Sequence, residues 1–368
     1  MGFADHLFPR IIGGSEVITG GPRVEGQETM EKNPDLTTLL GTEPLTVETR
    51  PVGLAIDPTP ADAVYIRNNL TAPTEVGEGW TVDLAGTSAD ATLTLSDIFE
   101  GLPRHEITTV LQCAGNGRRR LPTPAPGVQW ELGGMACVEW SGVRLADLVA
   151  AHGGPQDGRG YVTVLGGEAD PTDPARVERS VPAEPALESA LLADLMNGEP
   201  IPLIHGHPVR FVMPGYFAVN SVKWVRRVAF TDKQTDAEIQ ALRYRMVPPG
   251  GEPLPEHPSL WEMGPVSHII ESRAEGSDLH VSGVAFSGGD PVVAVEITID
   301  GEHWVETTLG PDRGRFAWRR FEGTVPTGSP WVASRCRTSG GVQHAHSEAN
   351  RDGYAVDGWR DLAQHHPA

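Results

Sequence analysis

One cysteine and its neighbours have the composition of a metal site. Cys113 follows an apolar stretch at residues 107–111 and precedes four small or polar residues and then three arginines at residues 118–120. Positive charge lowers the pKa of a nearby thiol, and a thiolate is a soft ligand that suits a transition metal. The pattern predicts a strand that ends in a turn with a metal-binding thiolate. The alternative is a buried structural cysteine, the commoner role of a cysteine taken alone.

Several segments resemble the motifs of one enzyme family. Residues 111–116 (Leu-Gln-Cys-Ala-Gly-Asn), followed by arginine, look like the metal-ligand motif of the sulfite oxidase family, which includes the assimilatory nitrate reductases of eukaryotes. Taken singly, His205, Arg210 and Lys223 would more often be a structural histidine and surface charges, but their joint placement favours a functional interpretation. The other segments that resemble the family in order and spacing are residues 64–70, 130–145, 196–202, 205–210, 214–215 and 221–224.

This resemblance implies a molybdenum atom held by the dithiolene of a molybdopterin and by the sulfur of Cys113. A phosphate needs cations and hydrogen-bond donors, and the matching segments supply both. The residues that the resemblance assigns to the cofactor are Arg67, Asn68, Asn69, Asp170, His205, Arg210, Ser221, Val222 and Lys223. The sequence contains no C-x-x-C-H motif, so no haem attachment is predicted.

The resemblance also implies a pocket for a small anionic substrate. Arg67 and Arg118 match the arginines that bind the anion, because guanidinium groups offer several fixed donors to an oxyanion. Trp130 matches an aromatic residue of the pocket, with plain core packing as its alternative. Tyr244 lies at the spacing of an active-site tyrosine, and its alternative is packing at a domain junction.

Three departures from the family pattern concern the substrate rather than the cofactor. Asn69 stands where the motif has histidine, and Gly117 stands where a first arginine is usual. Near the C-terminus, Asp352 takes the position of a pocket arginine of sulfite-oxidising members. A carboxylate there would repel sulfite unless the neighbouring Arg351 takes over by a one-residue shift.

The resemblance predicts oxidation of sulfite to sulfate by oxygen-atom transfer, with electrons passed to a separate acceptor. Within the same cofactor class, the alternatives are a reductase of sulfoxide or nitrate and a sulfane-sulfur dehydrogenase. A non-catalytic binding protein that retains the fold is an alternative of another class. The C-terminal part resembles the family's dimerisation domain and predicts a homodimer.

Composition excludes several other classes of protein. The 368 residues carry 29 basic and 49 acidic side chains, and a net charge of −20 opposes binding to nucleic acid or to an anionic membrane. Three cysteines without C-x-x-C spacing predict no disulfide framework and fit a reducing compartment. There is no apolar run of membrane-spanning length and no leader at the start, so we expect a cytoplasmic protein, or a periplasmic one if a leader has been removed.

The elements that must position these residues predict an α+β fold in two domains. We expect an extended arm at residues 1–60, a molybdopterin-binding catalytic domain at 61–258 and an immunoglobulin-like β-sandwich at 259–368, with the junction in the proline-rich stretch 246–265. Helical spacing predicts helices at residues 145–149 and 186–195, the second ended by Asn197 and Gly198. Alternation of period two predicts strands at residues 280–286, 293–299, 315–321 and 331–337.

Overall fold

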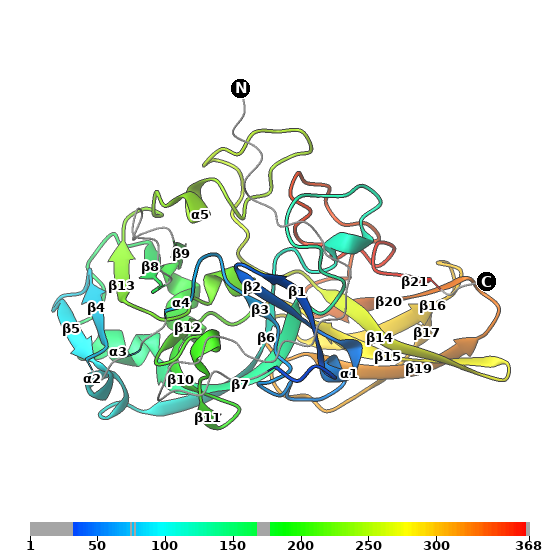
Figure 1. Ribbon diagram of the computed structural model, residues 1–368, viewed down its shortest axis with the longest axis horizontal. Helices are drawn as coiled ribbons and strands as arrows, with labels where there is room; N and C mark the ends of the chain where they lie inside the picture. The colour runs from blue at the N-terminus through cyan, green and yellow to red at the C-terminus, as the bar shows by residue number, and fades with distance from the viewer. Residues whose placement is uncertain (1–31, 74–75, 77–78, 168–176, 366–368) are drawn as a thin grey trace.

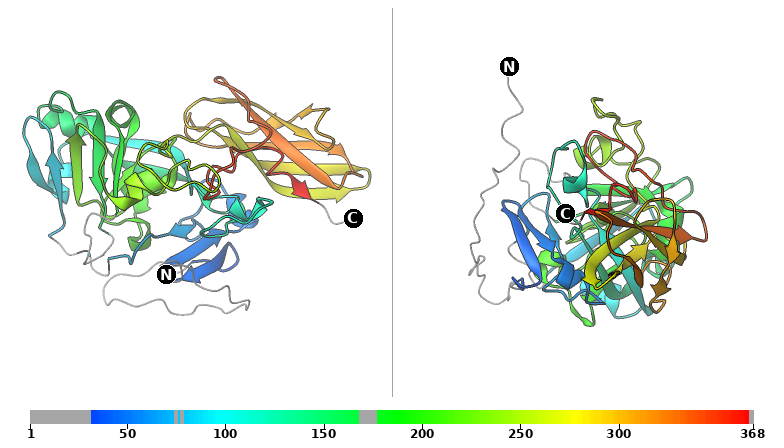
Figure 2. Two further views of the ribbon diagram at one scale, coloured as in Figure 1. Left: turned by 90° about the horizontal axis from the view of Figure 1, so that it is seen from above. Right: turned by 90° about the vertical axis from the view of Figure 1, so that its right-hand side faces the viewer.

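The computed structural model describes residues 32–73, 76, 79–167 and 177–365. Two bodies lie side by side, one built mainly by residues before 246 and the other by the strands after 265 (Figures 1 and 2). Strands predominate, and the α-helices of the described residues are only four to seven residues long. Within this described part, no helix is both long enough and apolar enough to cross a lipid bilayer.

The N-terminal segment is folded where the structure describes it, so the prediction of an extended arm up to residue 60 is wrong for residues 32–60. Strands β1 (Thr37–Thr42) and β2 (Leu45–Thr49) form a hairpin, and β2 also pairs with β3 (Ile66–Arg67). The short helix α1 (Pro51–Leu54) follows. Val47 and Leu54 are buried, and this burial of apolar surface anchors the segment to the domain.

An antiparallel sheet carries the predicted metal ligand. Its members are β6 (Arg104–Gln112), β7 (Met135–Arg144), β10 (Leu191–Met196) and β11 (Glu199–Pro200). A fifth strand, β12 (Arg210–Val212), pairs with the first half of β10, while β11 pairs with its end. Cys113 directly follows the last residue of β6, as the sequence predicts. The same sheet carries Arg210 at the start of β12.

A second, mixed sheet packs in the same body and shares a large apolar core with short helices. Its strands, in spatial order, are β5 (Ala91–Thr94), β4 (Thr81–Ala85), β13 (Arg227–Thr231), β8 (Tyr161–Leu165) and β9 (Glu178–Pro182). The helices are α2 (Leu95–Phe99), α3 (Leu145–Ala151), α4 (Ala183–Ser189) and α5 (Glu238–Ala241), with 3-10 turns η1 (Arg118–Arg120), η2 (Leu203–His205) and η3 (Ala218–Asn220).

One predicted helix is confirmed and the other is wrong in its second half. Helix α3 covers the predicted residues 145–149. Helix α4 ends at Ser189, and residues 191–196 form strand β10 instead, because their backbone pairs with β7 on one side and with β12 on the other. Asn197 and Gly198 have positive φ angles of 52° and 82° and form the tight turn from β10 into β11, which is the hairpin use of an Asn-Gly pair.

The second body is a sandwich of two four-stranded antiparallel sheets around a shared apolar core. One sheet contains β14 (Val266–Glu275), β15 (Asp278–Phe286), β18 (Thr308–Leu309) and β19 (Arg319–Pro326). The other contains β16 (Val292–Thr298), β17 (Val305–Glu306), β20 (Trp331–Thr338) and β21 (Gln364–His365). Three predicted strands match β15, β16 and β20, and the fourth begins later, at Arg319. The immunoglobulin type of the sandwich stays a prediction.

The chain after β20 returns to the first body. The backbone N–H of Ala355 donates to the carbonyl of Ala114 at 2.8 Å, and Nη1 of Arg120 donates to the carbonyl of Leu362 at 3.1 Å. This C-terminal segment therefore packs on the loop that follows Cys113, as the red and green-cyan loops of Figure 1 show. Residues 246–265 contain no helix and no strand longer than a bridge, and the domain junction there stays a prediction.

Gly142 offers a test of the contact between β7 and β10. A Cβ atom at this position would lie 2.1 Å from the carbonyl oxygen of Leu192 and 2.6 Å from Cα of Ala193. We therefore expect Gly142→Ala to lower the free energy of unfolding by about 1–3 kcal/mol, because rigid backbone would have to move. Gly160→Ala, where a Cβ meets no atom within 4 Å, is the control. Equal denaturant midpoints for the two variants would contradict this packing.

Candidate cofactor cleft and active site

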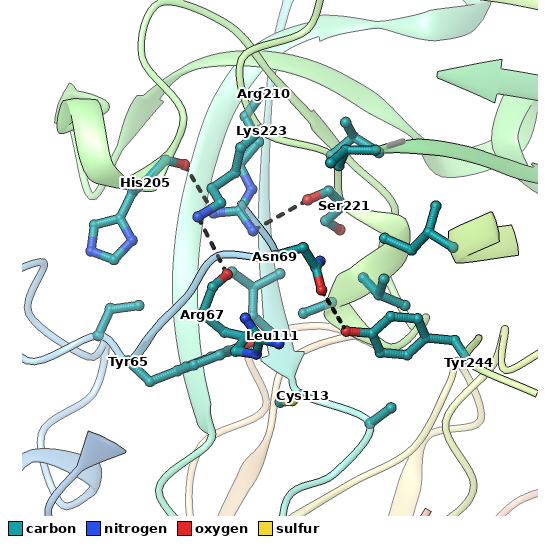
Figure 3. A pocket seen from close by; sticks show the side chains of 17 residues that line it. Tyr65, Arg67, Asn69, Leu111, Cys113, His205, Arg210, Ser221, Lys223 and Tyr244 are labelled. Atoms are coloured by element: carbon teal, nitrogen blue, oxygen red, sulfur yellow. Dashed lines mark hydrogen bonds between the residues drawn. The ribbon is translucent and has the colours of Figure 1, made fainter. Parts of the chain in front are cut away.

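One cavity, partly open to solvent, gathers most of the predicted site residues (Figure 3). The predicted residues that line it are Arg67, Asn69, Cys113, His205, Arg210, Ser221, Val222, Lys223 and Tyr244. Cys113 lies at one end, while Arg210 and Lys223 lie at the opposite end. Asn68 is buried next to the cavity and accepts a hydrogen bond from Nζ of Lys223. Asp170 lies outside the described residues.

Cys113 is the thiol that a ligand can reach. Its backbone N–H donates to the carbonyl of Gly134 at 2.8 Å, and its side chain is partly exposed to the cavity. Cys137 and Cys336 are buried, and burial raises the pKa of each to about 12. The described residues contain no group of three or more His, Cys, Asp or Glu side chains that could hold a metal ion.

The opposite end of the cavity is cationic. Arg210 donates from Nη1 to the carbonyl of His205 at 3.0 Å, and its guanidinium lies 5.0 Å from the ring centroid of Trp140. Lys223 donates to the carbonyl of Ile204 at 3.3 Å in addition to its bond to Asn68. The hydroxyl of Ser221 accepts from the backbone N–H of Met213 at 3.0 Å, which fixes this strand end.

Burial makes these groups unusual. It lowers the pKa of Arg210 to about 10 and holds the pKa of His205 well below its ordinary value, where nearby Lys32, Lys223 and Arg210 act in the same direction. His205 is therefore neutral at pH 7. Nη1 of Arg67 and Nε of Arg210 are buried and have no hydrogen-bond partner among the described residues. Unpaired buried donors are costly, so this cavity is suited to an anionic ligand.

Tyr244 and Arg67 face the same space as Cys113. The Tyr244 hydroxyl donates to the side-chain oxygen of Asn69 at 3.3 Å, so the residue that replaces the family's histidine here positions the phenol. Tyr244 has a positive φ angle of 51°, an uncommon backbone conformation for a bulky residue. Tyr65, whose role sequence reasoning missed, also lines the cavity, and its burial raises the pKa of its phenol.

Two residues predicted to contact the substrate do not line the cavity. Arg118 is buried in a space walled by Gly115 and Gly127, and it donates from Nε to the carbonyl of Asp352 at 2.9 Å and from Nη1 to that of Val128 at 2.7 Å. A backbone carbonyl of the C-terminal segment thus accepts a hydrogen bond from Arg118, an arginine that the motif assigns to anion binding. Trp130 is fully buried against Tyr65, with ring centroids 5.8 Å apart, which is the core packing considered as its alternative.

Asp352 and Arg351 do not line the cavity either. They form an ion pair with each other, with Nε–Oδ1 and Nη2–Oδ2 distances of 3.1 and 2.9 Å. The carboxylate is therefore partly neutralised and does not repel an anion in the cavity directly. The shift by which Arg351 would replace a pocket arginine does not occur in this structure.

Four side chains form a stack that ties the C-terminal segment to the cavity. The rings of Tyr244 and Tyr354 lie parallel, 5.4 Å apart with an interplanar angle of 18°. The guanidinium of Arg118 lies 5.3 Å from the Tyr354 ring, and that of Arg179 lies 5.6 Å from the Tyr244 ring. Cations and aromatic rings attract each other in this arrangement. The stack therefore holds the ring of Tyr244, while Asn69 contacts its hydroxyl.

Comparisons with known proteins agree with this geometry. The family model described as the oxidoreductase molybdopterin binding domain matches residues 69–239. Sulfite oxidase of Gallus gallus is 32% identical over 290 residues, which cover 73% of this chain and 63% of that protein. Mitochondrial sulfite oxidase of Homo sapiens is 31% identical over 302 residues, which cover 76% of this chain and 55% of that protein. The chain belongs to the sulfite oxidase family.

More distant relatives define the breadth of the family. The NADH-dependent nitrate reductase of Hordeum vulgare is 29% identical over 332 residues, covering 80% of this chain and 36% of the reductase. The crystal structure of the sulfane dehydrogenase SoxCD from Paracoccus pantotrophus has a TM-score of 0.75 at 23% identity and covers 94% of this chain and 92% of its own. That likeness shows the shared fold. The chain spans between about half and two thirds of the length of the sulfite oxidases it matches.

The cofactor of this family is molybdenum bound by molybdopterin, and the cavity fits it. A solitary thiol lies at one end, and Lys223 lies at the other with the buried Arg210, whose Nε has no hydrogen-bond partner among the described residues. When bound, the cofactor supplies the redox chemistry and the dithiolene ligands that a lone cysteine cannot provide. Cys113 would hold the metal, and Arg210, Ser221, Val222 and Lys223 would hold the pterin and its phosphate.

The placement of Arg118 can be tested through stability. Arg118→Met would leave the carbonyls of Asp352 and Val128 without their donor and remove the contact with Tyr354. We expect the free energy of unfolding to fall by about 2–4 kcal/mol. Arg119→Met is the control, because that exposed arginine makes only a surface ion pair with Glu131, worth about 0–1 kcal/mol. Urea unfolding measures both, and unchanged stability with weakened substrate binding in Arg118→Met would contradict the structural role.

Proposed function

We propose that the chain oxidises sulfite to sulfate by oxygen-atom transfer. The observation that carries this proposal is the meeting of Cys113, Arg67 and Tyr244 in one cavity whose other end is cationic. The relatives from Gallus gallus and Homo sapiens, both named sulfite oxidase, support the same reaction. A small oxyanion has a donor available there, since Nη1 of Arg67 has no partner among the described residues.

Each residue has a distinct part in this proposal. Arg67 binds the sulfite oxygens through its free N–H, and the low local dielectric strengthens that charge-assisted bond. Asn69 and the stacked Tyr354 position the Tyr244 hydroxyl, and when its proton turns away from Asn69 the hydroxyl can donate a hydrogen bond to the reacting oxygen. Cys113 holds the metal at the end of a rigid strand, where its position is set by the sheet.

Partners and location follow from the same reasoning. Electrons pass to an acceptor separate from this chain, whose sequence carries no C-x-x-C-H motif. We propose a homodimer that uses the β-sandwich, and a compartment in which the three unpaired thiols stay reduced. Cytoplasm fits this condition.

A sulfane-sulfur substrate is a second candidate, and one observation favours it. The guanidinium of Arg118 is taken up by carbonyls and that of Arg351 by Asp352, so Arg67 is the arginine that remains near Cys113 among the described residues. A persulfide carries one negative charge, whereas fully ionised sulfite carries two, so a persulfide needs fewer cations. SoxCD, which shares the fold, is named a sulfane dehydrogenase.

A steady-state assay with ferricyanide as electron acceptor tests the proposed function. We expect the molybdenum-loaded chain to turn over sulfite, and Arg67→Gln to raise KM for sulfite about 10- to 100-fold, because it removes a charge-assisted hydrogen bond. Arg104→Gln, at a surface ion pair with Asp194, is the matched control and should leave KM unchanged.

Other outcomes separate the alternatives. Turnover of thiosulfate but not of sulfite would support the sulfane candidate. Reduction of a sulfoxide or nitrate by the reduced protein would support a reductase. Absence of molybdenum and pterin after expression in a cofactor-competent host would support a binding protein without catalysis.

A further inference from the structure

Lys32 meets the cationic end of the cavity from a distant part of the chain. It precedes β1 and lies outside the residues 69–239 that match the molybdopterin binding domain. Its Nζ is 2.7 Å from Nε2 of His205, which is 173 positions away, and 2.6 Å from the carbonyl oxygen of Ala61. Lys32 does not line the described cavity itself but contacts the edge of the His205 ring, which does.

Lysine is rare in this chain, so the presence of two lysines near His205 is notable. Only three of the 29 basic residues are lysines, at positions 32, 223 and 233. Two of the three lie near His205: Lys32 and Lys223 both act to lower its pKa, and Lys223 acts to lower the pKa of Lys32. A lysine ammonium is a compact charge that binds phosphate as a point cation, whereas arginine favours planar, bidentate ligands.

The charges around Lys32 are not balanced by the described residues. Its hydrogen-bond partners are a carbonyl and an imidazole, and Asp62 is the acidic group that favours its charged form. Burial lowers the pKa of Lys32 to about 7, and the positive charge of Lys223 acts in the same direction. An anion of high charge density bound beside His205 would reverse this effect and keep the ammonium protonated.

The contact also orients His205. The ring is neutral, because its pKa lies well below the ordinary value. When Lys32 is charged it can only donate, so Nε2 of His205 accepts and the ring proton lies on Nδ1. The backbone of Ala61 also makes a hydrogen bond with the ring, and Arg210 holds the backbone carbonyl of His205 at 3.0 Å, so the position of His205 beside the cations is fixed from both sides.

We propose that Lys32 belongs to the site for the terminal phosphate of the cofactor, where it orients His205 and adds a positive charge beside Arg210 and Lys223. This inference rests on the cofactor site proposed above and extends it to a segment that precedes the molybdopterin binding domain. The ligand is a phosphate monoester, which carries close to two negative charges at neutral pH and matches a cluster of compact cations.

Retention of the cofactor tests the proposal without relying on activity. The full chain is expressed in a cofactor-competent host as wild type, Lys32→Met and Lys32→Arg, and molybdenum and pterin are measured before and after prolonged dialysis. We expect Lys32→Met to lose the cofactor about 10-fold faster or more than the wild type, and Lys32→Arg to recover part of the retention because it keeps the charge. Lys233→Met removes the third, exposed lysine and should match the wild type.

A second measurement separates a phosphate site from a structural role. Inorganic phosphate should raise the unfolding temperature of the cofactor-free wild type and of Lys233→Met, and most of this rise should be lost in Lys32→Met. A Lys32→Met chain that is less stable but keeps the full phosphate-induced rise, or that retains the cofactor as long as the wild type, overturns the proposal. If the wild type holds no molybdenum yet shows a Lys32-dependent phosphate effect, the proposed function fails while the phosphate site stands.

Discussion

A guanidinium N–H that is buried without an acceptor costs about 1–3 kcal/mol, and this cavity contains two such groups, on Arg67 and Arg210. The surrounding residues do not relieve the cost: His205 is neutral, and the carbonyl of His205 accepts from Nη1 of Arg210 but leaves its Nε without a partner among the described residues. In a chain with a net charge of −20, a cationic interior needs a specific reason. A bound anion supplies it, because the anion gains the hydrogen bonds that the protein leaves open.

The opposite end of the cavity depends on backbone geometry rather than charge. Strand β6 stops at Gln112, and the next residue presents its thiol into the cavity while its N–H is held by Gly134. The loop beyond it is covered by the C-terminal segment, through Ala355 and the stack of Tyr354 on Tyr244. The sandwich domain therefore contributes to the active site, since its trailing segment fixes the phenol and takes up the donors of Arg118.

The sequence alone predicted features that depend on a short local pattern or on the order of motifs. The apolar run before Cys113 predicted the strand end, and motif order predicted that His205, Arg210 and Lys223 would meet. Pairings between distant residues could not be foreseen. The leucine spacing at residues 187, 191 and 195 suggests one helix, but the partners β7 and β12 turn the second half into a strand. Arg118 is recruited by a carbonyl 234 positions away, and Lys32 reaches a histidine 173 positions away.

The sulfur of Cys113 is the proposed protein ligand to the metal, so the coordination of molybdenum is the most direct test. X-ray absorption at the molybdenum edge would be recorded for the wild type, for Cys113→Ser and for Cys336→Ala, whose thiol is buried in the sandwich. We expect Cys113→Ser to have one sulfur ligand fewer than the wild type and Cys336→Ala to have the same number. An unchanged sulfur coordination in Cys113→Ser would contradict this ligand assignment.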